Sequence, residues 1–275
     1  MPELPEVETT RRGIEPLVVG KLVRQTLVRQ PSLRWPVSPE LAQMLTGGRI
    51  TAIDRRAKYL LFNLDRGDQP GGRMMIHLGM SGSLRITPAD TLPRKHDHID
   101  VIFDDDTILR FHDPRRFGSV FWLPPGENHE LLDSLGPEPL SADFDGDYLY
   151  ERSRGRKVAV KQFIMNSQVV VGVGNIYANE SLYLSGIHPA RYAGRISRQR
   201  YVILASNIRR VLESAIQSGG TTLRDFVRED GTPGYFRQQL NVYGKAGKPC
   251  RGCGRLLRES RLGQRTTVYC AYCQR

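Results

Sequence analysis

Five segments in the first half of the chain are rich in β-branched and aromatic residues, and apolar and polar positions often alternate along them. Clusters of Gly, Pro and Asp separate the segments, as is typical of turns between short strands. The pattern predicts an antiparallel β-sandwich or barrel with strands in residues 21–30, 49–64, 73–86, 99–111 and 117–123.

A helix is predicted in front of this strand region. Pro5 suits a first helical turn, and Glu6 and Glu8 face the positive end of the helix dipole. The apolar stripe of this helix consists of Val7, Ile14 and Leu17. The helix would hold the N-terminus in place, whereas the default for a chain end is a frayed segment.

The pattern changes after Leu123. Residues 124–147 are rich in Pro, Gly and acidic residues, which indicates a connection between domains, and helical periodicity begins near Tyr148. The clearest helix is capped by Ser197 and ends at Gly219, with apolar positions at Ile203, Leu204, Ile208, Val211, Leu212, Ala215 and Ile216. Many glycines interrupt residues 220–249, which we interpret as a mobile loop.

All four cysteines lie in the last 26 residues, as Cys250, Cys253, Cys270 and Cys273. Two C-x2-C pairs on a hairpin are the spacing of a zinc ribbon, and four thiolates leave no open position, so the metal would be structural. Two disulfides are the alternative, which a reducing cytosol disfavours.

The net charge of +11 indicates a polyanionic partner. A membrane surface is the other candidate, but the chain has no long apolar run and its N-terminus lacks the order of a signal peptide. We therefore expect a globular protein of the cytoplasm or nucleoid that does not bind membranes.

Two stretches of the second half could hold phosphate. Gly172 and Gly174 allow a tight turn with outward amides in front of a helix that begins near Asn175, although an ordinary helix-packing turn explains the glycines equally well. Residues 152–161 contain five cations and no acid, which is also the pattern of a solvated face.

Two apolar side chains are flanked by turn residues or arginines. Phe117 follows Arg115 and Arg116 in HDPRRFG, and Met80 lies in HLGMSGS. Proteins that kink DNA insert such side chains between bases, and enzymes that flip a base fill the gap it leaves. Taken alone, each residue is more readily explained as part of a core.

Motifs along the whole chain together resemble the bacterial formamidopyrimidine-DNA glycosylase family. They are MPELPEVETTRRG, RRAKYL, HLGMSGSLRI, KHDHID, DPRRFG, LGPEPL, VGVGNIYANESL, GIHP, GTTLRDF, GTPGYF and the four-cysteine ribbon. The resemblance implies an α+β, multidomain protein: a helix and β-sandwich domain (1–123), a linker (124–147), a helix-two-turns-helix domain (148–249) and a zinc finger (250–275).

The family excises oxidised purines such as 8-oxoguanine and formamidopyrimidines from double-stranded DNA, and it then cleaves the strand at the abasic site. The resemblance makes Pro2 the nucleophile, Glu3 the general acid, Lys58 the β-elimination lysine and Arg265 the arginine of δ-elimination. It assigns gap filling to Met80, Arg115 and Phe117, and DNA-backbone contacts to His96, Arg156 and Asn175. The segment 221–235 corresponds to the loop that covers the flipped base. We expect one structural Zn²⁺ and a monomer.

A terminal proline suits this chemistry. An α-amine has a pKa of about 8, so a useful fraction is unprotonated at neutral pH, provided that Met1 is removed. Its adduct with a sugar C1′ is a cationic iminium that acidifies the C2′ proton. Two alternatives remain: an endonuclease VIII-like enzyme for oxidised pyrimidines, and a zinc-ribbon protein that binds DNA without catalysis.

Overall fold

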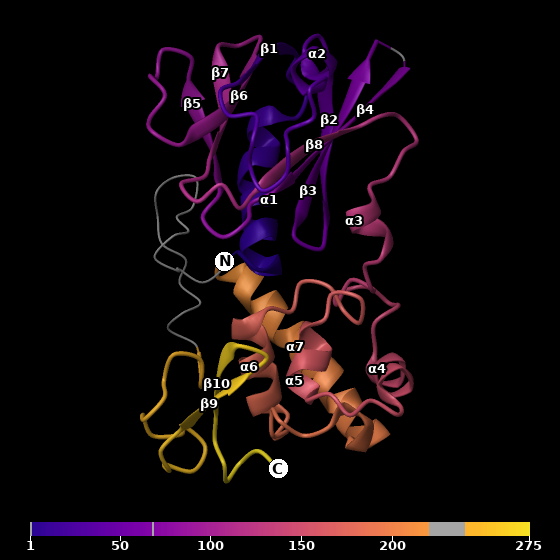
Figure 1. The fold of residues 1–275 in the computed structure, drawn as a ribbon, viewed down its shortest axis with the longest axis vertical. Coiled ribbons are helices and arrows are strands. Elements are labelled where there is room, and N and C mark those ends of the chain that lie inside the picture. The colour runs from indigo at the N-terminus through magenta and orange to yellow at the C-terminus, as the bar shows by residue number, and fades with distance from the viewer. Residues whose placement is uncertain (1, 68, 220–239) are drawn as a thin grey trace. The chain divides into compact units, whose positions relative to one another are not determined.

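The computed structural model describes residues 2–67, 69–219 and 240–275 (Figure 1). The chain divides into two compact units, of which the first contains the residues up to Asp133. The second contains Ser134–Ser218 and the C-terminal segment that ends at Arg275. The predicted loop at 221–235 lies outside the described residues.

The first unit begins with helix α1 (Leu4–Val18), as the sequence predicts. Glu3 and Glu6 form a capping box, in which the backbone N–H of Glu3 donates to Oε2 of Glu6 at 2.9 Å. The prediction that Leu17 is buried is wrong, because its side chain is 42% exposed. The buried apolar positions of the helix are Leu4, Val7, Ile14 and Val18.

Two four-stranded antiparallel sheets follow α1. In strand order, one sheet consists of β2 (Arg49–Arg56), β3 (Tyr59–Arg66), β4 (Gln69–His77) and β8 (Ser119–Leu123). The other consists of β1 (Val23–Val28), β6 (Asp97–Phe103), β7 (Thr107–His112) and β5 (Ser83–Pro88). The unit also contains the short helices α2 (Leu41–Leu45) and α3 (Glu130–Asp133).

Apolar side chains of α1 and of both sheets share one core, which includes Val7, Phe62, Phe103, Phe111 and Trp122. A sheet that buries one face against another in this way is a sandwich. The predicted antiparallel β-sandwich is therefore confirmed.

Three of the predicted strand segments each contain two strands. Residues 49–64 divide at Ala57 and Lys58, 73–86 divide after His77, and 99–111 divide after Phe103. The sequence does not signal the first division. Ala57 takes a φ of +54° in the turn, whereas Gly or Asn usually occupies such positions and would have indicated a turn.

The second unit is helical. It contains α4 (Gly146–Ser153), α5 (Val160–Met165), α6 (Asn175–Leu184), the 3₁₀ turn η1 (Ala193–Arg195), α7 (Arg198–Gln217) and the hairpin β9 (Arg258–Leu262) and β10 (Arg265–Tyr269). Ser197 caps α7 as predicted, and Gly219 follows its end with a φ of +72°. Ile203 was expected to be buried but is 50% exposed, whereas the other six predicted apolar positions are buried. The predicted α+β class is confirmed.

Candidate active site and nucleic-acid interface

The N-terminal residues of the first unit are anchored rather than frayed. Pro2 is buried, and Glu3 is 4% exposed at the N-cap of α1. The capping box fixes the backbone of Glu3, so the preceding residue also has a defined position. The residues predicted as nucleophile and general acid therefore lie together at the start of α1.

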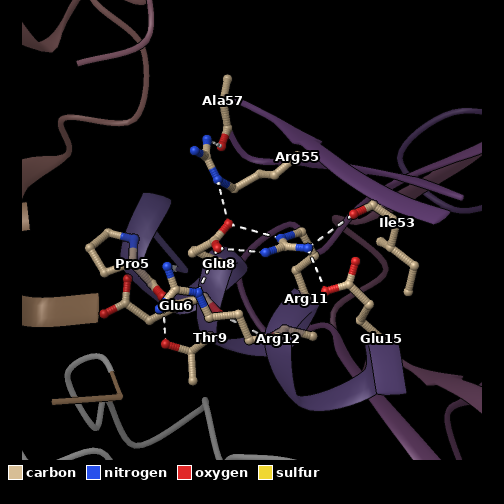
Figure 2. Close-up of polar contacts among 11 residues, drawn as sticks. Pro5, Glu6, Glu8, Thr9, Arg11, Arg12, Glu15, Ile53, Arg55 and Ala57 are labelled. Carbon is tan, nitrogen blue, oxygen red and sulfur yellow. Dashed lines mark hydrogen bonds and ion pairs between the residues drawn. The ribbon is translucent and has the colours of Figure 1, made fainter. Parts of the chain in front are cut away.

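Glu8 ties α1 to the β2–β3 hairpin (Figure 2). Its carboxylate accepts hydrogen bonds from Arg11 and Arg12 one turn later, and from Nε of Arg55 on β2 at 3.0 Å. Nη1 of Arg55 in turn donates to the carbonyl of Ala57 at 3.0 Å. Burial would raise the pKa of Glu8, but the hydrogen bonds and charges of the arginines prevail and lower it to about 2.

Lys58 follows Ala57 in the turn between β2 and β3, and its side chain is half-buried. The Glu8–Arg55 bridge therefore joins α1, whose N-cap Glu3 directly follows Pro2, to the turn that contains Lys58. The structure thus brings these predicted residues onto connected elements of one unit, 56 positions apart in the sequence.

His77, at the end of β4, was not predicted as a site residue. Burial, together with the charges of Lys58 and Arg34, lowers the pKa of His77 to about 4, so its ring is neutral at pH 7. Nδ1 accepts the backbone N–H of Gly79 at 3.0 Å, and the ring lies 4.8 Å from that of Tyr59. His77 therefore supports the turn that contains Met80.

Met80, Arg115 and Phe117 lie on two adjoining turns. A Cβ on Gly79 would come within 2.3 Å of the backbone carbon of Phe117, so the two turns are in backbone contact. Met80 is half-buried, Phe117 is 42% exposed, and the guanidinium of Arg115 lies 4.8 Å from the Phe117 ring centroid. The interpretation of Phe117 as a core residue is therefore wrong.

A fully buried carboxylate, Asp113, holds the two turns together. It accepts hydrogen bonds from Oγ of Ser81 at 2.8 Å and from the backbone N–H of Gly118 at 2.7 Å. The backbone N–H of Arg115 lies 3.3 Å from the same carboxylate. In the sequence, the Asp-Pro pair of HDPRRFG signals a turn but does not reveal that Asp113 is a buried acceptor.

His96 lies just before β6 and takes a φ of +75°, a conformation that is uncommon outside glycine. The next residue, Asp97, is buried and accepts hydrogen bonds from the backbone N–H of Arg94 at 2.7 Å and from Nη2 of Arg85 at 2.6 Å. Nδ1 of His112 lies 2.8 Å from the same carboxylate. Asp97 therefore fixes the turn that presents His96.

Three predicted site residues, the DNA-contact residues Arg156 and Asn175 and the catalytic residue Arg265, belong to the second unit. Arg156 is exposed before α5, Asn175 begins α6 after the N-cap Gly174, and Arg265 is exposed at the start of β10. Asn179 of α6 connects α6 to β10. Its Nδ2 donates to the carbonyl of Asn175 at 2.6 Å, and its Oδ1 accepts a hydrogen bond from the N–H of Val268 on β10 at 2.9 Å.

The basic segment 152–161 is only partly a solvated face. Arg156 and Lys157 are exposed, but Lys161 is fully buried. Nζ of Lys161 donates to the carbonyl of Thr266 at 2.9 Å and to Oγ1 of Thr267 at 2.7 Å. This lysine therefore fastens β10 to α5.

The four cysteines form one cluster. Their Sγ atoms lie within 4.8 Å of one another, with 3.9 Å between Cys250 and Cys273 and 3.5 Å between Cys253 and Cys270. Zn–S bonds of about 2.3 Å in a tetrahedron would separate the sulfurs by about 3.8 Å, so the donor set fits zinc. None of the four cysteines forms a disulfide, so all four sulfurs are available as metal ligands and the disulfide alternative is not supported. The hydroxyl of Tyr183 lies 3.2 Å from Sγ of Cys250.

Residues 1–120 match the model of the formamidopyrimidine-DNA glycosylase N-terminal domain, and residues 135–227 match that of the formamidopyrimidine-DNA glycosylase H2TH domain. The chain belongs to the formamidopyrimidine-DNA glycosylase family. Relatives of that name from Stenotrophomonas maltophilia (strain K279a) and Alcanivorax borkumensis are 57% and 58% identical, each over the full 275 residues of both chains.

Solved structures of the family have the same fold. The MutM (Fpg) protein from Thermus thermophilus has a TM-score of 0.88 at 37% identity, covering 99% of this chain and 98% of that one. A complex of Lactococcus lactis Fpg with DNA containing an abasic site has a TM-score of 0.90 at 32% identity over the whole of both chains. The helix-two-turns-helix prediction for the second unit is confirmed. No helix in the described ranges is long and apolar enough to span a membrane.

Proposed function

We propose that this chain is a bifunctional DNA glycosylase and abasic-site lyase of base excision repair, acting on oxidised purines in double-stranded DNA. Its relatives above 50% identity bear the name formamidopyrimidine-DNA glycosylase, and Lactococcus lactis Fpg has been crystallised with DNA containing an abasic site or Fapy-dG. The proposal places the enzyme in the bacterial cytoplasm, at the nucleoid, as a monomer.

One observation carries the mechanism: Pro2 and Glu3 lie at an anchored helix start that a charged bridge joins to the turn of Lys58. After removal of Met1, the Pro2 nitrogen attacks the sugar C1′ while the bond to the damaged base breaks. Glu3 supplies the proton for the opening sugar or the departing base. The product is a ring-opened iminium between Pro2 and C1′.

Elimination follows from this iminium. Loss of the C2′ proton allows the C3′–O bond to break, and we assign Lys58 to the departing 3′ phosphate. A second elimination breaks the C5′–O bond, and we assign Arg265 to that phosphate. A positive charge beside each leaving group lowers the barrier because negative charge develops there.

The remaining predicted residues receive DNA-binding roles. We assign Met80, Arg115 and Phe117 to the gap left by the flipped nucleotide, since two of them are exposed on turns fixed by Asp113. The residues assigned to the DNA backbone are His96, Arg156 and Asn175.

The domain organisation belongs to the same proposal. Residues 1–123 would form the catalytic domain, 124–147 the linker, 148–249 the helix-two-turns-helix domain and 250–275 the zinc finger. The loop over the flipped base would be 221–235. The cysteine cluster would hold one Zn²⁺ that stabilises the hairpin of Arg265, with all four ligand positions occupied.

Borohydride reduction in the presence of an abasic or 8-oxoguanine duplex tests the catalytic proposal. The expected result is a covalent complex whose DNA adduct maps by mass spectrometry to residue 2. Pro5→Ala, which alters the other proline of this segment, should still be trapped. A folded, zinc-loaded sample that gives no adduct would instead be a non-catalytic DNA-binding protein.

Two further measurements complete the test. Intact mass should show loss of Met1, because a retained Met1 acylates the proposed nucleophile. Excision of 8-oxoguanine should exceed that of thymine glycol, and the reverse preference would favour the endonuclease VIII-like alternative.

A further inference from the structure

The second unit has a concave surface that none of the roles above uses. Ala190, Arg191, Tyr192 and Arg195 line a hollow of about 280 Å³, here called the 190–195 notch. Tyr192 is 47% exposed, and both arginines are exposed. The hollow is slightly smaller than the roughly 300–1,000 Å³ of small-molecule pockets, so it fits a fragment of a larger ligand.

The two arginines of the notch lack acidic partners among the described residues. Arg195 lies over the ring of Tyr192, with 5.4 Å between the guanidinium carbon and the ring centroid. Arg198, only three residues later, forms ion pairs with Asp147 and Glu151 instead. Arg198 therefore has acidic partners, whereas the described residues provide none for the arginines of the notch.

The notch is continuous with the exposed part of the basic segment before α5. The N–H of Gly194 donates to the carbonyl of Arg156 at 3.0 Å, and the N–H of Ala193 donates to that of Val158 at 2.9 Å. The N–H of Val160 donates back to the carbonyl of Arg191 at 2.8 Å. This backbone pairing makes one basic surface. Its exposed cations with no acidic partner in the part of the chain that the structure describes include Arg156, Lys157, Arg191 and Arg195.

We propose that the 190–195 notch binds the sugar-phosphate backbone of the DNA strand beside the phosphate assigned to Arg156. The inference rests on the proposed function, because it takes Arg156 as a DNA contact. Arginines bind phosphate oxygens in a bidentate manner, and a tyrosine contacts the sugar or donates its hydroxyl to a phosphate. An extended row of cations matches a polymer of phosphates better than it matches a single anion.

The test is the salt dependence of binding to a duplex that contains a tetrahydrofuran abasic analogue. The double variant Arg191→Gln/Arg195→Gln is compared with wild type and with Arg198→Gln, which removes an arginine that already has acidic partners. Loss of two phosphate contacts should make the slope of log K against log salt shallower by about 2, which weakens binding by up to about a hundredfold at 0.1 M salt relative to 1 M salt. Tyr192→Ala should weaken binding without changing the slope.

A second arm locates the contact. Shortening the duplex from each end should abolish the difference between wild type and the double variant at one defined length, where the flanking phosphate is lost. Single-turnover excision at saturating enzyme should be unchanged, because the notch is not assigned to the reacting atoms. Zinc content and melting temperature of each variant verify the fold.

Three results would overturn the inference. An unchanged slope in the double variant, while Arg156→Gln lowers it, would remove the notch from the interface but leave the proposed function intact. A decrease in slope of about 1 in Arg198→Gln, half that of the double variant, would show that only net charge matters. Failure of wild type itself to bind the duplex would refute both the inference and the proposed function.

Discussion

Replacement of Asp113 by asparagine should loosen the two turns that carry Met80, Arg115 and Phe117. The carboxylate is fully buried and receives its closest hydrogen bonds on different oxygens, from Ser81 on Oδ1 and from Gly118 on Oδ2. Asparagine has the same shape but turns one acceptor oxygen into an NH₂ donor. Whichever side the new NH₂ group takes, it would then face at least one of the groups that now donate a hydrogen bond to the carboxylate.

The magnitude follows from these contacts. Hydrogen bonds to a charged group contribute about 1.5–3 kcal/mol each, and a neutral one about 1 kcal/mol. If Asp113→Asn keeps one bond in neutral form and loses the other, the free energy of unfolding of the first unit should fall by about 3 kcal/mol. For a unit of this size, that corresponds to a decrease in melting temperature of about 10 °C.

Thermal unfolding followed by circular dichroism measures this effect. Asp105→Asn is the matched control, because Asp105 is an exposed aspartate whose ion pair with Lys21 lies at the surface. Surface pairs contribute at most about 1 kcal/mol, so the control should melt within about 3 °C of wild type. Asp113→Asn should also weaken binding to abasic-analogue DNA. A melting temperature equal to that of the control would refute the role assigned to Asp113.

Three other outcomes are expected. Gly79→Ala should lower the free energy of unfolding of the first unit, measured in urea, by about 1–3 kcal/mol, because the new Cβ clashes with Phe117 and the φ of +64° is strained for alanine. Gly126→Ala is the control: its φ is also positive, but its Cβ would meet open space, so its free energy of unfolding should fall by less. Since the folded pKa of Glu8 is about 2, its stabilisation is complete above about pH 4.5 and lost towards pH 2. As the pH is lowered from 4.5 to 2, the melting temperature of Glu8→Gln should therefore fall less steeply than that of wild type. Parallel plots of melting temperature against pH for the two proteins would contradict this. Tyr183→Phe should release zinc faster to a chelator, and an unchanged rate would show that the 3.2 Å contact to Cys250 is unimportant.

The fold was largely predictable because its signals are local. The cysteine spacing, Pro5 at the start of α1, the Ser197 cap of α7 and the alternation in the strands are each signals that span only a few residues. Errors arose where tertiary contacts decide. Leu17 and Ile203 fit the apolar stripes of their helices but are exposed. Periodicity predicts which face of a helix is buried only to within about one residue position, and packing against the core decides the edge of that face.

The candidate site was predictable only in its motifs. Pro2, Glu3 and Lys58 came from the resemblance, and no local pattern links Glu8 to Arg55, which lies 47 residues later. The i,i+3 and i,i+4 pairs of Glu8 with Arg11 and Arg12 are contacts within the helix. Their further role appears only when β2 packs against α1.

A buried carboxylate lies beneath each predicted DNA-facing turn of the first unit. Glu8 supports the turn of Lys58 through Arg55, Asp113 supports the turns of Met80 and Arg115, and Asp97 supports that of His96. A buried charge is costly unless donors surround it. The donors to Asp113 belong to the two turns, those to Asp97 include the backbone N–H of Arg94, and those to Glu8 are arginines of α1 and β2.

This arrangement addresses a problem that a protein with a net charge of +11 must meet. Cations gathered to bind phosphate repel one another, and exposed turns that carry them tend to open. An acid on the surface would cancel the attraction for DNA, whereas an acid buried under the turn holds its backbone while the cation stays exposed. Neutralising these acids should therefore disorder the interface more than it strengthens binding, and for that reason Asp113→Asn should weaken DNA affinity although it makes the protein more positive.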